Sequence, residues 1–285
     1  MIYHLYLIGA MIIVGSSVPA GKLVVDNLPV YYSMAVRFLI GTLFMFTFVK
    51  YKGFSVGGLG VRAHLLIAVQ AMLGSVFFTL LLLEGLKTLS ASASGIITGT
   101  LPVVVLVLSV VLTGERLNLA RVVAVFIAAL GVMFINADSG DFSATLKGSL
   151  FVLAAVVCEA GFLLLRKKLP DSISSLVLSL YVSMYGFIYF ILFAIREQVI
   201  YYSIGSVGFG GYLLIAYYGM FITAVAYILW FKGIARVSGS YASVYTAVMP
   251  VSAVVLSSVL LGERLTIMHL GGLGLVLLAM VLIRR

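Results

Sequence analysis

Long apolar runs separated by short polar segments are the main pattern along the chain of 285 residues. A helix that crosses a bilayer needs about 20 largely apolar residues, and backbone exposed to lipid must form helices or a closed barrel. The pattern therefore predicts an all-α integral membrane protein with ten transmembrane helices. They are expected at residues 3–19, 29–49, 61–83, 91–113, 119–135, 148–165, 173–195, 212–231, 241–261 and 266–283.

The composition favours the same environment. Hydrophobic residues make up 63% of the chain and charged residues only 9%, whereas soluble domains carry about 25% charged residues. A soluble globule of this composition would expose large apolar areas. The formal charge of +9 does not indicate nucleic acid, because the cations are scattered between apolar runs. The single cysteine, Cys158, excludes a disulfide framework.

The first apolar run resembles the hydrophobic region of a secretory signal peptide that ends in small residues. No Lys or Arg precedes this run, and further runs follow it. We therefore expect it to be retained as the first helix.

Cations near helix ends predict the orientation, because they are retained on the cytoplasmic side. With the N-terminus inside, the inner loops and the C-terminus hold 12 Lys and Arg residues and the outer loops hold 5. Both termini are predicted to be cytoplasmic. The remaining cation, Arg37, falls inside a span.

An internal repeat is the strongest signal in the sequence. Shifted by 148 residues, segment 90–117 matches segment 238–265 at 14 of 28 positions, including the sequence Gly-Glu-Arg-Leu at 114–117 and 262–265. Equivalent elements are five helices apart, an odd number, so the second half enters the membrane in the opposite direction. We predict a first five-helix repeat at residues 1–137, a linker at 138–147 and a second repeat at 148–285.

Several residues carry a resemblance to a known family. They are Gly15, Ser16, Lys22, Leu28, Pro29, Arg37, Phe38, Ser90, Ser92, Ser94, Pro102, the Gly-Glu-Arg-Leu sequence and Gly131. Over essentially its whole length the chain resembles the ten-helix drug/metabolite exporters, or EamA-type transporters. One departure is Val14, where the family often has tryptophan before the first-helix glycine.

The resemblance implies a basket-like helix bundle with a central cavity between the halves. It also implies alternating access acting on amino acids, metabolites or xenobiotics, and a place in the plasma (inner) membrane. It does not identify the substrate.

Two charged residues are predicted deep in the membrane. Arg37 lies about 12 Å along its helix from the outer end, at 1.5 Å per residue, so it should face the interior. It could bind a substrate carboxylate or phosphate, or it could cap helix-end carbonyls or pair with an internal acid. Glu159, about 10 Å from the inner end of its helix, could exchange a proton as cargo moves, hold a substrate ammonium, or be a neutral acid bonded to a hydroxyl.

Other candidate binding residues lie near the expected cavity. Lys22, at the outer end of the first helix, could anchor that helix at the interface or lie at the cavity mouth. Tyr241 and Tyr245 have the spacing of one helix face, as do Tyr181, Tyr185 and Tyr189. Either stripe could line a cavity or belong to an interfacial belt.

Small and hydroxylated residues mark the fourth span and its repeat. Ser94 and Thr98 could line the cavity, while Gly95 and Gly99 form a GxxxG pattern typical of close helix packing. Pro102 and Pro250 each remove a backbone hydrogen bond, so they predict kinks in mid-helix at symmetry-related places bordering the pathway.

No pattern indicates an enzyme. The histidines are isolated, and no GxSxG, Walker A, HExxH or dinucleotide fingerprint occurs. We expect no catalytic site, no cofactor, no metal and no ATP-driven step.

The sequence predicts a secondary transporter, an exporter of amino acids or similar small amphipathic metabolites, with possible proton coupling. It would work in the lipid bilayer as a monomer or weak dimer. A multidrug carrier for cationic hydrophobic compounds and a lipid flippase-like module are the alternatives.

Overall fold

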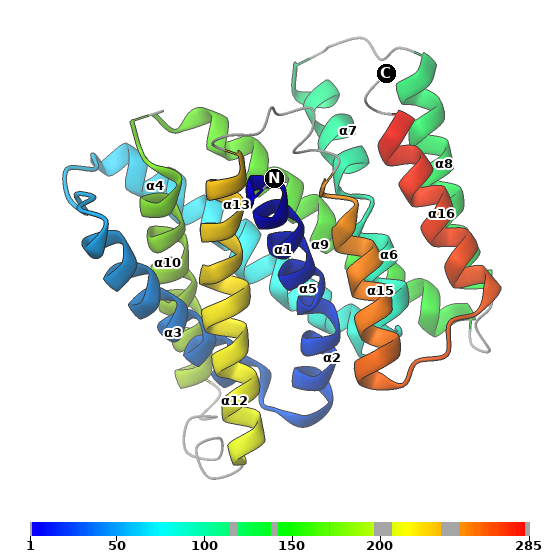
Figure 1. Cartoon of the computed structure of the whole chain (residues 1–285), viewed down its shortest axis with the longest axis horizontal. Helices are drawn as coiled ribbons and strands as arrows, with labels where there is room; N and C mark the ends of the chain where they lie inside the picture. Colours follow the sequence, from blue (N-terminus) through cyan, green and yellow to red (C-terminus); the bar gives the residue numbers. More distant parts are fainter. Residues whose placement is uncertain are drawn as a thin grey trace.

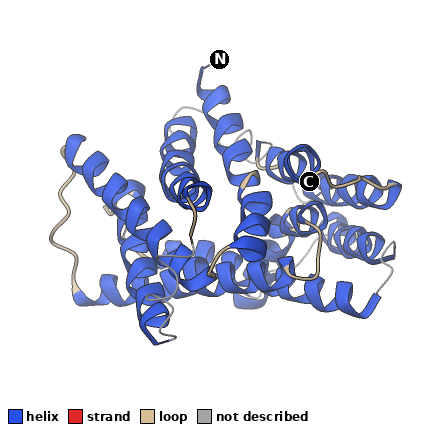
Figure 2. Cartoon of the chain, turned by 90° about the horizontal axis from the view of Figure 1, so that it is seen from below, coloured by secondary structure: helices blue, strands red, loops and turns tan. Residues whose placement is uncertain are grey.

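The computed structural model describes residues 2–113, 119–137, 142–170, 172–196, 207–234 and 245–282. All regular structure in these residues is helical (Figure 2). The elements before residue 138 are α1 (Ile2–Gly15), α2 (Ser17–Asn27), α3 (Val30–Tyr51), α4 (Val61–Ala71), η1 (Met72–Phe77), α5 (Phe78–Leu86), α6 (Ala91–Thr98), α7 (Leu101–Thr113) and α8 (Leu119–Ala137). Those after it are α9 (Phe142–Leu165), η2 (Arg166–Lys168), α10 (Ser175–Arg196), α12 (Phe209–Tyr217), η3 (Tyr218–Val225), α13 (Ala226–Ile234), α15 (Val248–Leu261) and α16 (Ile267–Leu282).

Helix length and hydropathy make this a multi-pass membrane protein. Seven described segments are long and apolar enough to cross a membrane: Ile2–Asn27, Val30–Tyr51, Val61–Leu86, Ala91–Leu112, Thr145–Leu165, Ser175–Ile195 and Phe209–Trp230. The apolar helices Leu119–Phe134, Val248–Leu261 and Ile267–Leu282 are shorter. All these helices coincide with predicted apolar runs, while a total of ten crossings stays a prediction.

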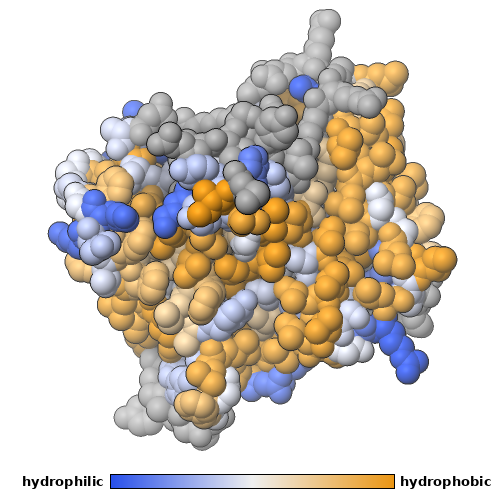
Figure 3. Space-filling view, viewed as in Figure 1, coloured by the Kyte–Doolittle hydropathy of each residue, from blue (hydrophilic) through white to orange (hydrophobic). Residues whose placement is uncertain are grey.

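Large apolar side chains point outward on many helices. Leu43, Phe126 and Val259 are 59%, 67% and 73% exposed. The face seen in Figure 3 is largely hydrophobic, with hydrophilic side chains gathered toward its margins. Such a surface is stable against lipid and would aggregate in water.

Helices from the two halves of the chain pack against each other in a reciprocal pattern (Figure 1). Sequence-equivalent spans are neighbours: the fifth contacts the tenth through α8 and α16, the fourth contacts the ninth through α6 and α15, and the second contacts the seventh through α3 and α10. The first span contacts the eighth through α1 and α13, and the third contacts the sixth through α5 and α9. The start of α1 and the end of α16 lie on the same side of the molecule (Figure 1).

The helix boundaries correct several predictions. The first span does not end near residue 19, because α2 continues to Asn27 after a break at Ser16. Helix α9 begins at Phe142, so the last six residues of the predicted linker are helical.

The two prolines do not kink helices in mid-course. Pro102 is the second residue of α7, after a turn at Gly99–Thr100, and Pro250 is the third residue of α15. In the first turn of a helix the missing N–H has no intrahelical partner to lose. The fourth span is interrupted as expected, but two residues ahead of its proline.

A feature absent from the predictions is a π-helical segment in the third and eighth spans. Residues Met72–Phe77 and Tyr218–Val225 have this wider winding. Shifted by 148, the first segment falls on 220–225, inside the second. Single π turns within α-helices occur frequently at functional sites.

Candidate functional site

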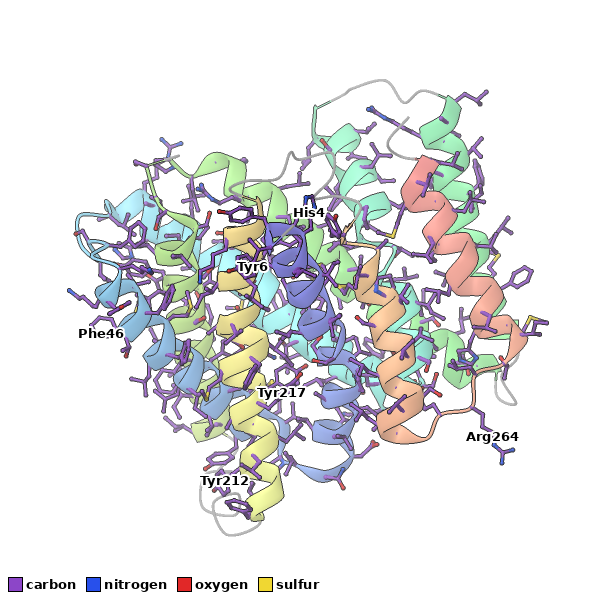
Figure 4. All side chains as sticks on the ribbon, viewed as in Figure 1. His4, Tyr6, Phe46, Tyr212, Tyr217 and Arg264 are labelled. Carbon is purple, nitrogen blue, oxygen red and sulfur yellow. The ribbon has the colours of Figure 1, made fainter. Side chains whose placement is uncertain are left out.

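The break between α1 and α2 forms one wall of a polar cluster in the protein interior. Here the Ser16 hydroxyl donates to the Ile13 carbonyl oxygen at 2.6 Å and contacts the Tyr217 hydroxyl at 2.6 Å. Tyr217 lies partway along the eighth span, beside the first (Figure 4). The next tyrosine, Tyr218, donates to the Ser17 carbonyl oxygen at 2.8 Å. Two tyrosines of the eighth span thus contact the chain at this break, one through a side-chain hydroxyl and one through a backbone carbonyl oxygen.

Arg37 enters this cluster from α3, as its depth predicted. Its Nε donates to Thr223 Oγ1 at 3.1 Å, and its guanidinium lies 4.1 Å from the centre of the Tyr218 ring and 4.8 Å from that of Phe38. The Thr223 hydroxyl in turn donates to the Tyr218 carbonyl oxygen, five residues earlier, at 3.1 Å. The π-helical winding therefore supplies both the hydroxyl and the ring that hold the arginine.

The guanidinium keeps donor capacity for a ligand. Arg37 is only partly buried and makes no ion pair within the described residues. Of its five N–H groups, one reaches the Thr223 hydroxyl and one a weak acceptor, Met34 Sδ, at 3.5 Å. Neither predicted structural role is seen there, because Arg37 pairs with no described acid and caps no described helix-end carbonyl.

Glu159 projects from α9 and is also partly buried. The phenol of Tyr227, in α13, interacts electrostatically with both Glu159 and Arg37. The two interior charges form no salt bridge with each other. Tyr227 therefore lies in the field of two opposite charges supplied by different spans.

Lys22 is bound within the protein. Its Nζ donates to the Leu86 carbonyl oxygen at 2.7 Å and lies 3.3 Å from Asp26 Oδ1. Leu86 is the last residue of α5, where free carbonyls favour a cation. Lys22 lies within α2, not at the outer end of the first helix, and connects α2 to α5.

The small residues of α6 provide close packing. The Ser94 hydroxyl donates to the Ser90 carbonyl oxygen at 3.0 Å, and the Thr98 hydroxyl to that of Gly95 at 2.8 Å. Both side chains are buried. A Cβ atom on Gly95 would lie 2.6 Å from Ala253 Cβ, and one on Gly99 2.9 Å from Pro250 Cβ. The glycines let α6 and α15 approach closely, and the two hydroxyls are bonded to their own helix.

The tyrosines are found in separate places. The Tyr245 hydroxyl lies 2.8 Å from Nδ1 of His4, which α1 carries near one end of the first span (Figure 4). Tyr241 lies outside the described residues. In the other stripe, the Tyr185 hydroxyl lies 3.1 Å from His64 Nδ1, and Tyr189 donates to the Ala68 carbonyl oxygen at 3.2 Å. That stripe packs α10 against α4.

The Gly-Glu-Arg-Leu sequence of the second half forms a contact that sequence reasoning did not assign. The two carboxylate oxygens of Glu263 accept from the backbone N–H groups of Ala91 and Ser92 at 2.6 and 2.8 Å. These residues open α6, so the acid caps a helix of the other half. Ser90 also caps this helix, since its Oγ accepts from Ala93 N at 3.1 Å.

Comparison with known proteins identifies the family. The sequence profile of the EamA-like transporter family matches residues 1–137 and 146–285. The chain belongs to the EamA-like transporter family. An uncharacterized transporter of Bacillus subtilis (strain 168), YetK, is 37% identical over 281 residues, which cover 96% of this chain and 84% of that protein. A WAT1-related chloroplastic protein of Arabidopsis thaliana is 23% identical over 94% of this chain and 66% of that protein.

A solved crystal structure shows a similar fold. It superposes with a TM-score of 0.66 at 18% identity and covers 97% of this chain and 94% of that one. Membrane transport is the activity shared by the EamA-like family and the transporter relative. No group of three or more potential metal ligands occurs among the described residues.

Proposed function

We propose that the chain is a secondary active transporter that exports amino acids or similar small amphipathic metabolites across the plasma (inner) membrane. The observation that carries this proposal is the pair of oppositely charged residue types in the interior, Arg37 and Glu159, which both interact electrostatically with Tyr227. A zwitterion offers both an anion for the guanidinium and a cation for the carboxylate.

Partial burial of both charges, with no oppositely charged partner among the described residues, is expensive unless a ligand or solvent stabilises them. The aromatic rings around Arg37 stabilise its charge only in part. A bound substrate carboxylate would supply the missing partner, and a phenol such as Tyr227 could hydrogen-bond to either end of a short zwitterion.

Alternating access would follow from two inverted five-helix repeats. The repeated sequence, the two family matches and the reciprocal packing of equivalent helices support such a two-fold relation. The start of α1 and the end of α16, which lie on the same side, fit an even number of crossings (Figure 1). In this proposal the paired π-helical segments border the substrate site and change shape between the outward-open and inward-open states.

Proton coupling would use Glu159. A carboxyl group in low-dielectric surroundings can bind a proton when cargo leaves and release it when a cationic group arrives. Export would then be driven by the inward proton gradient, with one face of the transporter open at a time.

The experiment is flux in proteoliposomes after a thermal-shift screen of amino acids, nucleobases and cationic dyes. We expect an amino acid to stabilise the protein and a pH gradient to drive its movement. Glu159→Gln should abolish the pH dependence, and Tyr227→Phe should weaken apparent affinity about 2- to 10-fold, the value of one hydrogen bond. Thr47→Val, whose exposed hydroxyl bonds only to its own helix, is the control.

The other possible outcomes of these experiments distinguish the proposal from its alternatives. If no small solute stabilises the protein or crosses, the proposal is wrong. Stabilisation by cationic dyes alone, with Glu159 needed and Arg37→Gln tolerated, would favour the multidrug alternative. Lipid movement without soluble flux would favour the flippase-like alternative.

A further inference from the structure

A groove on the side of the molecule lies between the start of α3, the end of α5 and α9. It has a volume of about 490 Å³, within the range of roughly 300–1,000 Å³ typical of small-molecule sites. Its lining is mostly apolar and includes Val30, Leu80, Leu81 and Phe151. Charged side chains occur at one end of this groove, where Glu84 and Lys87 line it. The groove is separate from the interior polar cluster.

The charged end lies at the depth of the lipid headgroups. Glu84 lies in the last turn of the 26-residue segment Val61–Leu86, and Lys87 follows it directly. Such a helix is about 39 Å long at 1.5 Å per residue, which exceeds the roughly 30 Å of the hydrocarbon core. Its last turn therefore reaches the polar layer, while the apolar floor of the groove faces the acyl chains.

Two charges line this end, and a third lies near one of its lining residues. Glu84 Oε2 and Lys87 Nζ are 2.5 Å apart, and their side chains are 43% and 52% exposed. Lys147 Nζ lies 6.0 Å from the centre of the Phe151 ring, whose side chain lines the groove. The two ammonium groups can bind a phosphate, and the single carboxylate can accept hydrogen bonds from a primary ammonium.

We infer that this groove is a binding site for a phospholipid with a phosphate and a primary ammonium headgroup, that is, a phosphatidylethanolamine. The acyl chain occupies the apolar floor, the phosphate contacts Lys87 and Lys147, and the ammonium contacts Glu84. A choline headgroup carries the same charges but has no N–H to donate to the carboxylate. The inference needs only the membrane setting and holds whatever the cargo is.

The test uses quenching of a single tryptophan by brominated lipids. Trp230 is the only native tryptophan, so Trp230→Phe gives a silent background. Phe151→Trp places the probe in the groove. Phe44→Trp places it in a second groove of about 500 Å³ on α3, whose lining holds no acidic residue, and serves as the matched control.

In the full-length protein in vesicles, we expect brominated phosphatidylethanolamine to quench the Phe151→Trp probe with about two- to fivefold higher relative affinity than brominated phosphatidylcholine, the ratio for one exposed ion pair. Glu84→Gln should remove that preference, and the Phe44→Trp probe should show none. Equal quenching of the Phe151→Trp probe by both lipids, or a preference that survives Glu84→Gln, overturns the inference. Stronger quenching by brominated phosphatidylglycerol would also overturn it, since a simple cationic patch would then suffice.

Discussion

The carboxylate of Glu263 holds the start of α6 from the other half of the chain, and its removal should weaken the fold measurably. Its two oxygens accept from Ala91 N and Ser92 N at 2.6 and 2.8 Å. In Glu263→Ala both backbone N–H groups lose this acceptor. In Glu263→Gln one oxygen remains, without the charge.

The magnitude follows from the geometry. Losing a helix N-cap acceptor costs about 0.5–2 kcal/mol, and the loss of an anion at a helix N-terminus adds about 0.3–1 kcal/mol. Glu263 is partly exposed, so water replaces some of the interaction. We expect Glu263→Ala to lower the free energy of unfolding by about 2 kcal/mol and Glu263→Gln by about half as much. For a large chain, 2 kcal/mol corresponds to a fall in Tm of about 4–8 °C.

The assay is thermal unfolding of the purified protein in detergent, followed by intrinsic fluorescence. Glu84→Ala is the control in detergent, because the ion pair that this acid forms among the described residues, with Lys87, is exposed and exposed pairs contribute about 0–1 kcal/mol. If Glu263→Ala melts at the same temperature as Glu84→Ala, the cap does not stabilise the fold and the reasoning fails.

Two further substitutions test the interior packing by the same melting assay. Thr223→Val should lower stability by about 1–2 kcal/mol, since its hydroxyl accepts from the interior guanidinium and donates to a carbonyl; Thr47→Val, whose exposed hydroxyl bonds only to its own helix, should stay within about 0.5 kcal/mol, and equal effects would contradict the assignment. Gly95→Ala should lower stability by about 1–3 kcal/mol, because its Cβ would lie 2.6 Å from Ala253 Cβ. Gly274→Ala meets nothing within 4 Å and should be neutral or stabilising; a neutral Gly95→Ala would show that the helices can separate.

Hydrophobic pattern was enough to predict the helical membrane fold. The apolar runs located the described helices because the bilayer imposes length and composition on any span. The depth of Arg37 predicted its interior position, since a charge facing lipid would be too costly. The Gly95 and Gly99 spacing likewise indicated the close contact of α6 with a neighbour, although not which helix that neighbour is.

Contacts between distant segments could not be read from the sequence. Thr223 and Tyr218, which contact Arg37, both belong to the π-helical segment, and no residue pattern in 218–225 predicts that winding. Glu263 stood out as part of a repeated motif, but its partner N–H groups belong to the backbone and leave no sequence signal. The kinks expected at the two prolines were predicted in the wrong place. In the fourth span the interruption is the turn before Pro102, and Pro102 itself lies in the first turn of the helix that follows.

Partners distinguish the structural charges from those available to a substrate. Lys22 and Glu263 form hydrogen bonds with backbone groups at distances under 3 Å, so both side chains are bonded within the fold. Arg37 and Glu159 lie deeper and form no ion pair within the described residues, although isolated charges are least stable there. If Arg37 and Glu159 served only to stabilise the fold, we would expect them to form an ion pair with each other. Two unpaired interior charges are less favourable for folding than apolar residues at the same positions. Two unpaired charges, both in electrostatic interaction with Tyr227, are physically reasonable when a ligand with complementary charges completes the site.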